Sequence, residues 1–339
     1  MNPYVFVVGC PRSGTTLLGR LLNAHPQLAI IHEGRFVAAW YERRRGVTPD
    51  GAVTPQLVDD LLAFPPFRNV HVSREQLERL ADGAEPVSYA RFVSGVFDLH
   101  GAAKGKPLVG DKTPHYVRSL PTLHALWPQA RFVHIVRDGR DVCLSVGNWP
   151  KVVERGGAVA RFSHYERDPV AIAALWWEWQ VRLGREAGSG FGPHRYMEIS
   201  YESLVDDPTA ACRALCTFLD VPYDERMLAF HEGRTRDDPG LDAKQAWRPV
   251  TRGLRDWRND MPAGAVERFE AASGELLEEL GYARAAPSPG GEAVERAALA
   301  RRSFARDVER KRHRRLPAGW AQGDATARTT PDNRSPTRR

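Results

Sequence analysis

The sequence predicts an α/β protein, in which a central parallel β-sheet is flanked by helices in a three-layer sandwich. Three observations carry this prediction. Short apolar segments alternate with longer segments of helical periodicity, which is the pattern of parallel strands joined by helical crossovers. The first apolar segment runs directly into a glycine-containing loop. Polar and charged residues follow the ends of three strands, where parallel sheets of this class bind ligands.

The expected strands are short apolar runs, often rich in β-branched residues. Four of them stand out, and a short additional strand is expected at Leu28–Ile31. The helical segments carry apolar residues every three or four positions, so that each buries one face. The four strands are Tyr4–Val8, Pro107–Val109, Arg131–Val136 and Arg195–Ile199, and the helices are Leu17–Leu22, Leu57–Phe64, Arg74–Ala81, Val87–His100, Leu120–Leu126, Arg140–Val146, Val170–Gly184, Thr209–Leu219 and Ala263–Leu280.

The composition is that of an ordinary globular protein, with 42% hydrophobic and 27% charged residues. No apolar run approaches the roughly 18–20 residues that span a bilayer, and no basic segment precedes an apolar stretch at the N-terminus. We therefore expect a cytoplasmic protein, and the Arg/Ala/Gly-rich composition suggests a bacterial source. The four cysteines lack metal-ligand spacing, so no metal is expected.

The net charge of +6 is concentrated at the C-terminus. Residues 285–339 hold 13 Lys/Arg against 6 Asp/Glu, which leaves a net charge of −1 on residues 1–284. This distribution argues against a nucleic-acid partner. We expect one domain over residues 1–284 and a basic, largely disordered tail over 285–339. Within the tail, Glu292–Arg315 has the pattern of a basic helix, either solvated or docked on an acidic partner or membrane surface.

The loop after the first strand has the spacing of a nucleotide-binding P-loop, G-x-x-x-x-G, from Gly9 to Gly14. The sandwich is therefore expected to be P-loop-like. The next residue is Thr15 in place of the lysine that reaches the γ-phosphate of ATP, while Arg12 offers a planar guanidinium for a phosphate or sulfate. These features favour a donor other than ATP. A P-loop kinase or NTPase is the alternative, and the missing lysine argues against it.

A second anion site is predicted after the strand Arg131–Val136. That strand delivers Arg137, and Ser145 follows two helical turns later, close to the same side. An arginine paired with a hydroxyl suits a second phosphate group. Asp138 is interpreted as the N-cap of the following helix rather than as a carboxylate that organises Mg²⁺.

The order and spacing of these motifs resemble the sulfotransferases that use 3′-phosphoadenosine-5′-phosphosulfate (PAPS), in particular tyrosylprotein sulfotransferases and related bacterial enzymes. The resemblance extends from about residue 4 to residue 282. Two phosphate motifs in the same order, joined by further matches, make it specific. The matching segments are Pro11–Thr16, Leu21–Pro26, Glu33, Asp111–Pro114, Trp127–Arg131, Val136–Arg140, Ile199–Val205 and Phe218–Pro222.

The resemblance implies PAPS as donor and assigns residues to its two ends. Arg137 and Ser145 would bind the 3′-phosphate, and Tyr201 would contact the nucleotide near it. The alternative for Tyr201 is a buried ring that satisfies a backbone group. The residues that would wrap the 5′-phosphosulfate are Arg12, Ser13, Gly14, Thr15 and Thr16.

The resemblance also implies in-line transfer of a sulfuryl group to a hydroxyl or amine of an unidentified acceptor. Arg12 and Lys112 would stabilise the developing charge without a metal. Glu33 would be the general base, with His115 as the alternative. A small metabolite, a glycan or a lipid is the expected acceptor, bound beside residues 35–106. A non-catalytic nucleotide-binding protein is the third interpretation.

Overall fold

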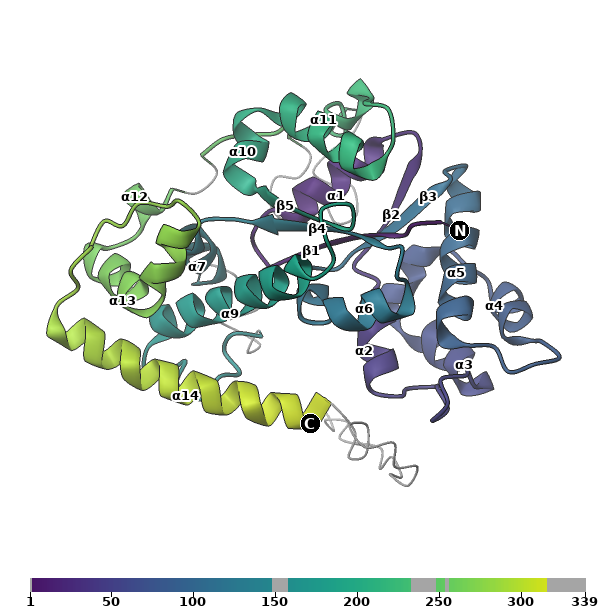
Figure 1. The fold of residues 1–339 in the computed structure, drawn as a ribbon, viewed down its shortest axis with the longest axis horizontal. Helices are drawn as coiled ribbons and strands as arrows, with labels where there is room; N and C mark the ends of the chain where they lie inside the picture. The colour runs from purple at the N-terminus through teal and green to yellow at the C-terminus, as the bar shows by residue number, and fades with distance from the viewer. Residues whose placement is uncertain (1, 148–157, 233–247, 254–255, 316–339) are drawn as a thin grey trace, which may run out of the picture.

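The computed structural model describes residues 2–147, 158–232, 248–253 and 256–315 (Figure 1). Its centre is a five-stranded sheet of order β2-β3-β1-β4-β5 in which neighbouring strands run parallel. The predicted α/β sandwich is confirmed. The strands are β1 (Val5–Gly9), β2 (Leu28–His32), β3 (Leu108–Lys112), β4 (Arg131–Val136) and β5 (Tyr196–Ser200).

Side chains of β1 alternate between two apolar cores, one on each face of the sheet. Val5 and Val7 belong to the core beneath α1, α10 and α11, whereas Phe6 and Val8 belong to the core on the opposite face. This alternation follows from the two-residue period of a strand, and burial on both faces explains why β1 is apolar throughout.

Helices cover both faces (Figure 1). The elements that pack on the first core are α1 (Thr15–Ala24), α10 (Tyr201–Asp206), α11 (Pro208–Leu219) and the 3₁₀ helix η3 (Glu225–Met227). On the other face lie α2 (Val37–Glu42), α3 (Pro55–Ala63), α4 (Arg74–Ala81), α5 (Tyr89–Lys104), α6 (Leu120–Leu126), and the 3₁₀ helices η1 (Pro65–Val70) and η2 (Pro114–Arg118).

A third apolar core lies beyond the carboxyl end of β4. It is formed by α7 (Gly139–Gly147), α9 (Pro169–Ser189), α12 (Trp257–Asp260) and α13 (Ala263–Glu279). Two tryptophans of α9, Trp176 and Trp177, are buried in this core.

The segment Gly291–Arg315 forms a single helix, α14, that lies along α9 and α13 (Figure 1). Phe304 stacks on Phe162 with ring centroids 4.3 Å apart, and Asp307 accepts hydrogen bonds from the backbone and hydroxyl of Ser163 at 2.7 and 2.8 Å. The basic helix expected at Glu292–Arg315 is thus present, and it packs on the folded body, because its buried stripe of alanines permits close helix packing. The domain boundary after residue 284 stays a prediction, and residues 316–339 lie outside the described part.

Among the described residues, no helix has both the length and the apolar character that crossing a membrane requires. The cytoplasmic location and the bacterial source stay predictions.

Candidate active site

The β1–α1 loop is shaped by residues with positive φ. Gly9 and Gly14 have φ of +154° and +95°, and Arg12 has φ of +81°. A side chain is also sterically excluded at both glycines: a Cβ would lie 2.5 Å from the carbonyl oxygen of Ile135 at Gly9 and 2.4 Å from the Tyr201 ring at Gly14. The glycine spacing seen in the sequence is therefore required by the backbone path of the loop.

The loop presents hydrogen-bond donors around the start of α1. The N-cap residue Gly14 has no side chain to accept hydrogen bonds from the backbone N–H groups in the first turn of α1, which begins with Thr15 and Thr16. Ser13 is fully buried, yet its hydroxyl has no hydrogen-bond partner among the described residues. Because buried polar groups are normally paired, this arrangement is suited to an anion seated on the loop.

The second motif lies directly against the first. Arg12 Nε donates to the Ser145 hydroxyl at 2.8 Å, although the two residues are 133 positions apart. Arg137, at the end of β4, stacks its guanidinium over Tyr201, 4.2 Å from the ring centroid. The same Tyr201 ring lies against Gly14. The structure thus brings both predicted anion motifs and Tyr201 together at the carboxyl edge of the sheet.

Arg137 is held in a fixed orientation and keeps a buried hydrogen-bond donor that no described residue uses. Its Nη2 donates to Asp141 at 2.9 Å, and Asp141 in turn accepts from the backbone N–H of Trp257 at 2.9 Å. The Nε of Arg137 is buried and has no partner among the described residues. Asp141 was not singled out in the sequence, although its position in the first turn of α7, four residues after Arg137, is the signal that would have found it.

Asp138 caps α7, as predicted. Its carboxylate accepts from the backbone N–H of Arg140 at 2.9 Å and also pairs with the Arg140 guanidinium at 2.7 Å. Arg140 is fully buried and reaches Glu270 of α13 at 2.6 Å. Since an unpaired buried charge is costly, these contacts anchor α13 to the start of α7, which carries Ser145.

The ends of β2 and β3 place Glu33 beside Lys112. The two residues are joined by the Glu33 N–H, which donates to the Lys112 carbonyl at 2.9 Å, and by the Lys112 Nζ, which donates to Glu33 Oε1 at 3.0 Å. Glu33 Oε2 pairs with Arg35, a residue that the sequence interpretation had not assigned. Burial raises the pKa of the Glu33 carboxyl, but Lys112 and then Arg35 lower it by more, so the pKa lies far below its usual value.

The two cations that contact Glu33 differ in burial. The Lys112 side chain is 1% exposed, whereas that of Arg35 is 56% exposed. Removing one partner of a buried ion pair costs about 3–5 kcal/mol, while an exposed pair contributes only about 0.2–1 kcal/mol. The ion pair of Glu33 with Lys112 is therefore more stable than its ion pair with Arg35.

Asp111 and His115 are two other titratable groups near Glu33. Burial is the main reason that the pKa of Asp111 rises to about 7, although Thr113 donates to its carboxylate at 2.6 Å. Burial first, and then the cation of Arg118, lower the pKa of His115 to about 3. His115 is thus neutral and weakly basic in this environment.

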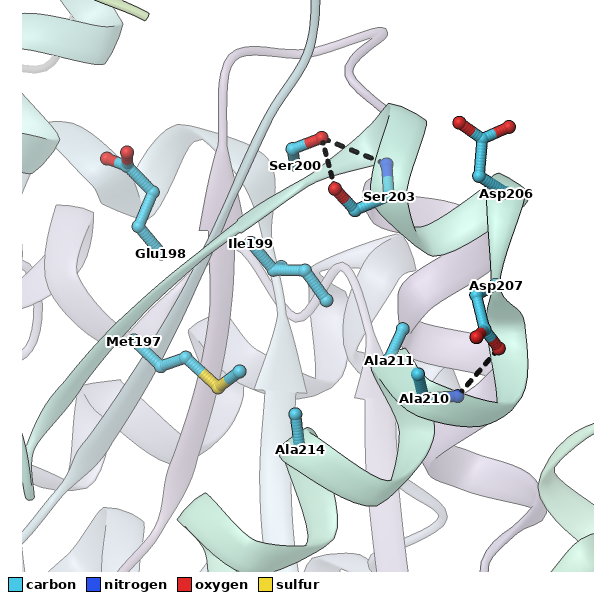
Figure 2. Close-up of a pocket in the computed structure, with 10 residues that line it drawn as sticks. All are labelled: Met197, Glu198, Ile199, Ser200, Ser203, Asp206, Asp207, Ala210, Ala211 and Ala214. Carbon is cyan, nitrogen blue, oxygen red and sulfur yellow. Dashed lines mark hydrogen bonds between the residues drawn. The ribbon is translucent and has the colours of Figure 1, made fainter.

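A separate pocket of about 510 Å³ lies between β5 and helices α10 and α11 (Figure 2). Two of its polar groups serve as helix caps: Ser200 accepts from Ser203 N–H at 3.0 Å, and Asp207 accepts from Ala210 N–H at 2.9 Å. None of the residues predicted for the site lines this pocket. The described part of the chain holds no cluster of His, Cys, Asp and Glu suited to a metal ion.

The sheet order, the β1–α1 loop and the adjoining arginine–serine motif define a P-loop-like α/β protein with two anion-binding motifs. The sequence profile of the Sulfotransferase family matches residues 3–225. This match covers well over half of the chain, and the protein belongs to the sulfotransferase family. The resemblance inferred from the motifs is confirmed.

Individual relatives and structures agree with this assignment. Protein-tyrosine sulfotransferase A of Caenorhabditis elegans is 24% identical over 289 residues, which cover 83% of this chain and 67% of the relative. Nodulation protein NoeE of Sinorhizobium fredii is 26% identical over 303 residues, covering 82% and 65%. The sulfotransferase domain of the Synechococcus PCC 7002 olefin synthase superposes with a TM-score of 0.56 at 24% identity, covering 83% and 95%, which shows a shared fold.

Proposed function

We propose that the protein transfers the sulfuryl group of PAPS to a hydroxyl or amine of an acceptor. The observation that carries this proposal is the hydrogen bond from Arg12 to Ser145, which joins the two anion motifs into one surface. A donor with phosphate groups at both the 3′ and 5′ positions would use both halves of such a surface. An ATP-dependent kinase would use only the first half, and it would lack the loop lysine.

The residues present fit such a donor. The Ser13 hydroxyl and the Arg137 Nε are buried without partners among the described residues, and each motif therefore has an unused hydrogen-bond donor. Gly14 has no side chain and so leaves room for the Tyr201 ring to pack against the loop. In our assignment the 5′-phosphosulfate lies on Arg12, Ser13, Gly14, Thr15 and Thr16, and the 3′-phosphate lies on Arg137 and Ser145, next to Tyr201.

The proposed reaction is an in-line displacement at sulfur. The acceptor oxygen forms a bond to sulfur while the bridging S–O bond to the 5′-phosphate breaks, and its electron pair leaves with the bisphosphate. Glu33 takes the acceptor proton. Arg12 and Lys112 balance the negative charge that builds on the bridging and sulfuryl oxygens. Lys112 donates a hydrogen bond to Glu33 at 3.0 Å and would thereby place this base next to the sulfuryl group.

Glu33 is a better candidate for the base than His115. Both have pKa values below neutrality, so each is unprotonated at pH 7. The lowering at Glu33 comes from two neighbouring cations, of which Arg35 is more than half exposed and can leave. The lowering at His115 comes first from its burial, which persists while the protein is folded.

The acceptor is proposed to be a small molecule, a glycan or a lipid that binds beside α2–α5, next to Glu33. The names of the relatives add protein tyrosine to the classes to be tested. An acceptor panel from these four classes, assayed with PAPS by mass spectrometry, distinguishes them.

The donor is tested first, by calorimetry with 3′,5′-bisphosphoadenosine (PAP) and by transfer from ³⁵S-labelled PAPS. We expect binding in the micromolar range and label in an acceptor. Absence of PAP binding would remove the proposal. Mg²⁺-dependent ATP turnover would favour the kinase alternative, and PAP binding without transfer to any acceptor would favour a non-catalytic protein.

A further inference from the structure

Both carboxylate oxygens of Glu33 are occupied by cations in this structure. Oε1 accepts from the Lys112 Nζ at 3.0 Å, and Oε2 pairs with the Arg35 guanidinium. A general base needs a carboxylate oxygen within hydrogen-bond reach of the proton that it accepts. Each oxygen keeps a second lone pair, but a cation that moves off one oxygen leaves that oxygen open to the acceptor and more basic.

The turn that carries Glu33 and Arg35 is held in an unusual conformation. Both residues have positive φ, +54° and +60°, which side-chain-bearing residues rarely adopt. The turn is fixed to β3, because Glu33 N–H donates to the Lys112 carbonyl at 2.9 Å and Arg35 N–H donates to the Thr113 hydroxyl at 3.4 Å. Strain of this kind persists where the surrounding structure enforces it, and it is typical of functional sites.

The two cations are not equally able to leave. Lys112 is buried, and its ammonium would lose its Glu33 partner without gaining water. Arg35 is more than half exposed, so its guanidinium exchanges one carboxylate contact for solvent. Arg35 is therefore the partner that gives way.

We propose that Arg35 covers Oε2 of Glu33 in the acceptor-free protein and is displaced from it by the acceptor hydroxyl. Oε2 is then the atom that receives the proton, while Lys112 keeps Oε1 and holds the carboxylate in place. Arg35 is a positioning residue in this scheme. The inference rests on the proposed sulfuryl transfer, because only that reaction gives Glu33 a proton to accept.

The displacement of Arg35 also bears on hydrolysis of the donor by water. While Arg35 covers Oε2, Glu33 is a weaker base toward water, and hydrolysis of the donor is slowed. Without this cover, a water oxygen forms the bond to sulfur, the S–O bond to the 5′-phosphate breaks with its electron pair on the bisphosphate, and the proton passes to Oε2. The charged and titratable groups facing Glu33 are Lys112 and Asp111 on β3, His115 on η2, and Arg35.

The test measures release of PAP from PAPS in the absence of any acceptor. Arg35→Met removes the cation and keeps an unbranched side chain, and Arg35→Gln is a second such variant. We expect both to release PAP about ten-fold faster than the wild type, since general-base catalysis contributes at least this much. Arg35→Lys, which restores a cation, and Arg43→Met, an exposed arginine at the end of α2, should stay at the wild-type rate.

In the double variant Glu33→Gln/Arg35→Met, the increase in the rate of PAP release should be lost. In addition, the acid limb of the pH–rate profile should move to higher pH in Arg35→Met, because one of the cations that lower the pKa of Glu33 is gone. Calorimetry with PAP establishes that each variant is folded. Unchanged release in both Arg35→Met and Arg35→Gln with normal PAP binding would overturn the inference, as would an increase that survives in the double variant. A wild-type protein that fails to bind PAP would overturn the proposed function instead, and this inference with it.

Discussion

Gly14 is the position at which the β1–α1 loop depends most directly on a distant residue. Its φ of +95° disfavours any side chain, and a Cβ there would lie 2.4 Å from the buried ring of Tyr201. The left-handed region costs a residue with a side chain about 1–2 kcal/mol, and overpacking a buried site costs about 1–3 kcal/mol. We therefore expect Gly14→Ala to lower the free energy of unfolding by about 2–5 kcal/mol and to weaken PAP binding.

Gly105 provides the matched control. It also has a positive φ, +64°, at the end of α5, but a Cβ there would meet no atom within 4 Å. Gly105→Ala should thus cost only the backbone share, about 1–2 kcal/mol. The difference between the two variants, about 1–3 kcal/mol, isolates the Tyr201 contact and corresponds to a roughly 5- to 150-fold change in the unfolding equilibrium constant.

Urea unfolding followed by circular dichroism measures these differences, and calorimetry with PAP measures the effect on binding. In a Tyr201→Ala background the cost of Gly14→Ala should fall to that of Gly105→Ala, because the obstructing ring is gone. Equal destabilisation by the two glycine variants, or no relief in the double variant, would refute the role that we assign to the Gly14–Tyr201 contact.

Three further predictions concern the site. Glu33→Gln should lower kcat by about 10²- to 10⁴-fold at an unchanged Kd for PAP, because only the proton acceptor is lost. Arg137→Ala should raise the Kd for PAP about 10- to 100-fold, since charge-assisted hydrogen bonds contribute about 1.5–3 kcal/mol, and should leave binding of adenosine 5′-phosphosulfate nearly unchanged. Asp111→Asn should reduce the loss of Tm between pH 5 and pH 8. Burial raises the pKa of Asp111 from 3.8 to about 7, so the folded wild type binds more protons than the unfolded chain in this window and loses stability as the pH rises.

Each of these predictions has a clear contrary result. If His115→Ala lowers kcat while Glu33→Gln does not, the base is His115. Equal weakening of both nucleotides by Arg137→Ala would place that residue away from the 3′-phosphate. An equal Tm difference between pH 5 and pH 8 in Asp111→Asn and the wild type would mean that Asp111 does not titrate in this range.

The sequence by itself determined the fold class and the family. Apolar runs such as Arg131–Val136 and the glycine spacing from Gly9 to Gly14 are local signals, because a buried strand and a tight loop each constrain the residues that form them. Asp138 as a helix cap is equally local, since a cap bonds to a residue two positions away. Such features can be predicted without knowing what lies across the molecule.

The tertiary structure decided which groups meet. The contact of Arg12 with Ser145 and the packing of Tyr201 on Gly14 join segments more than 100 residues apart, and only the strand order brings them together. For helix α14 the sequence left open whether the helix is solvated or docked, because charged residues dominate its pattern and its small buried face is recognised only against α9 and α13. The contact of Lys112 with Glu33 likewise depends on β2 and β3 ending side by side, because the charges that surround a carboxylate are set by its neighbours in space.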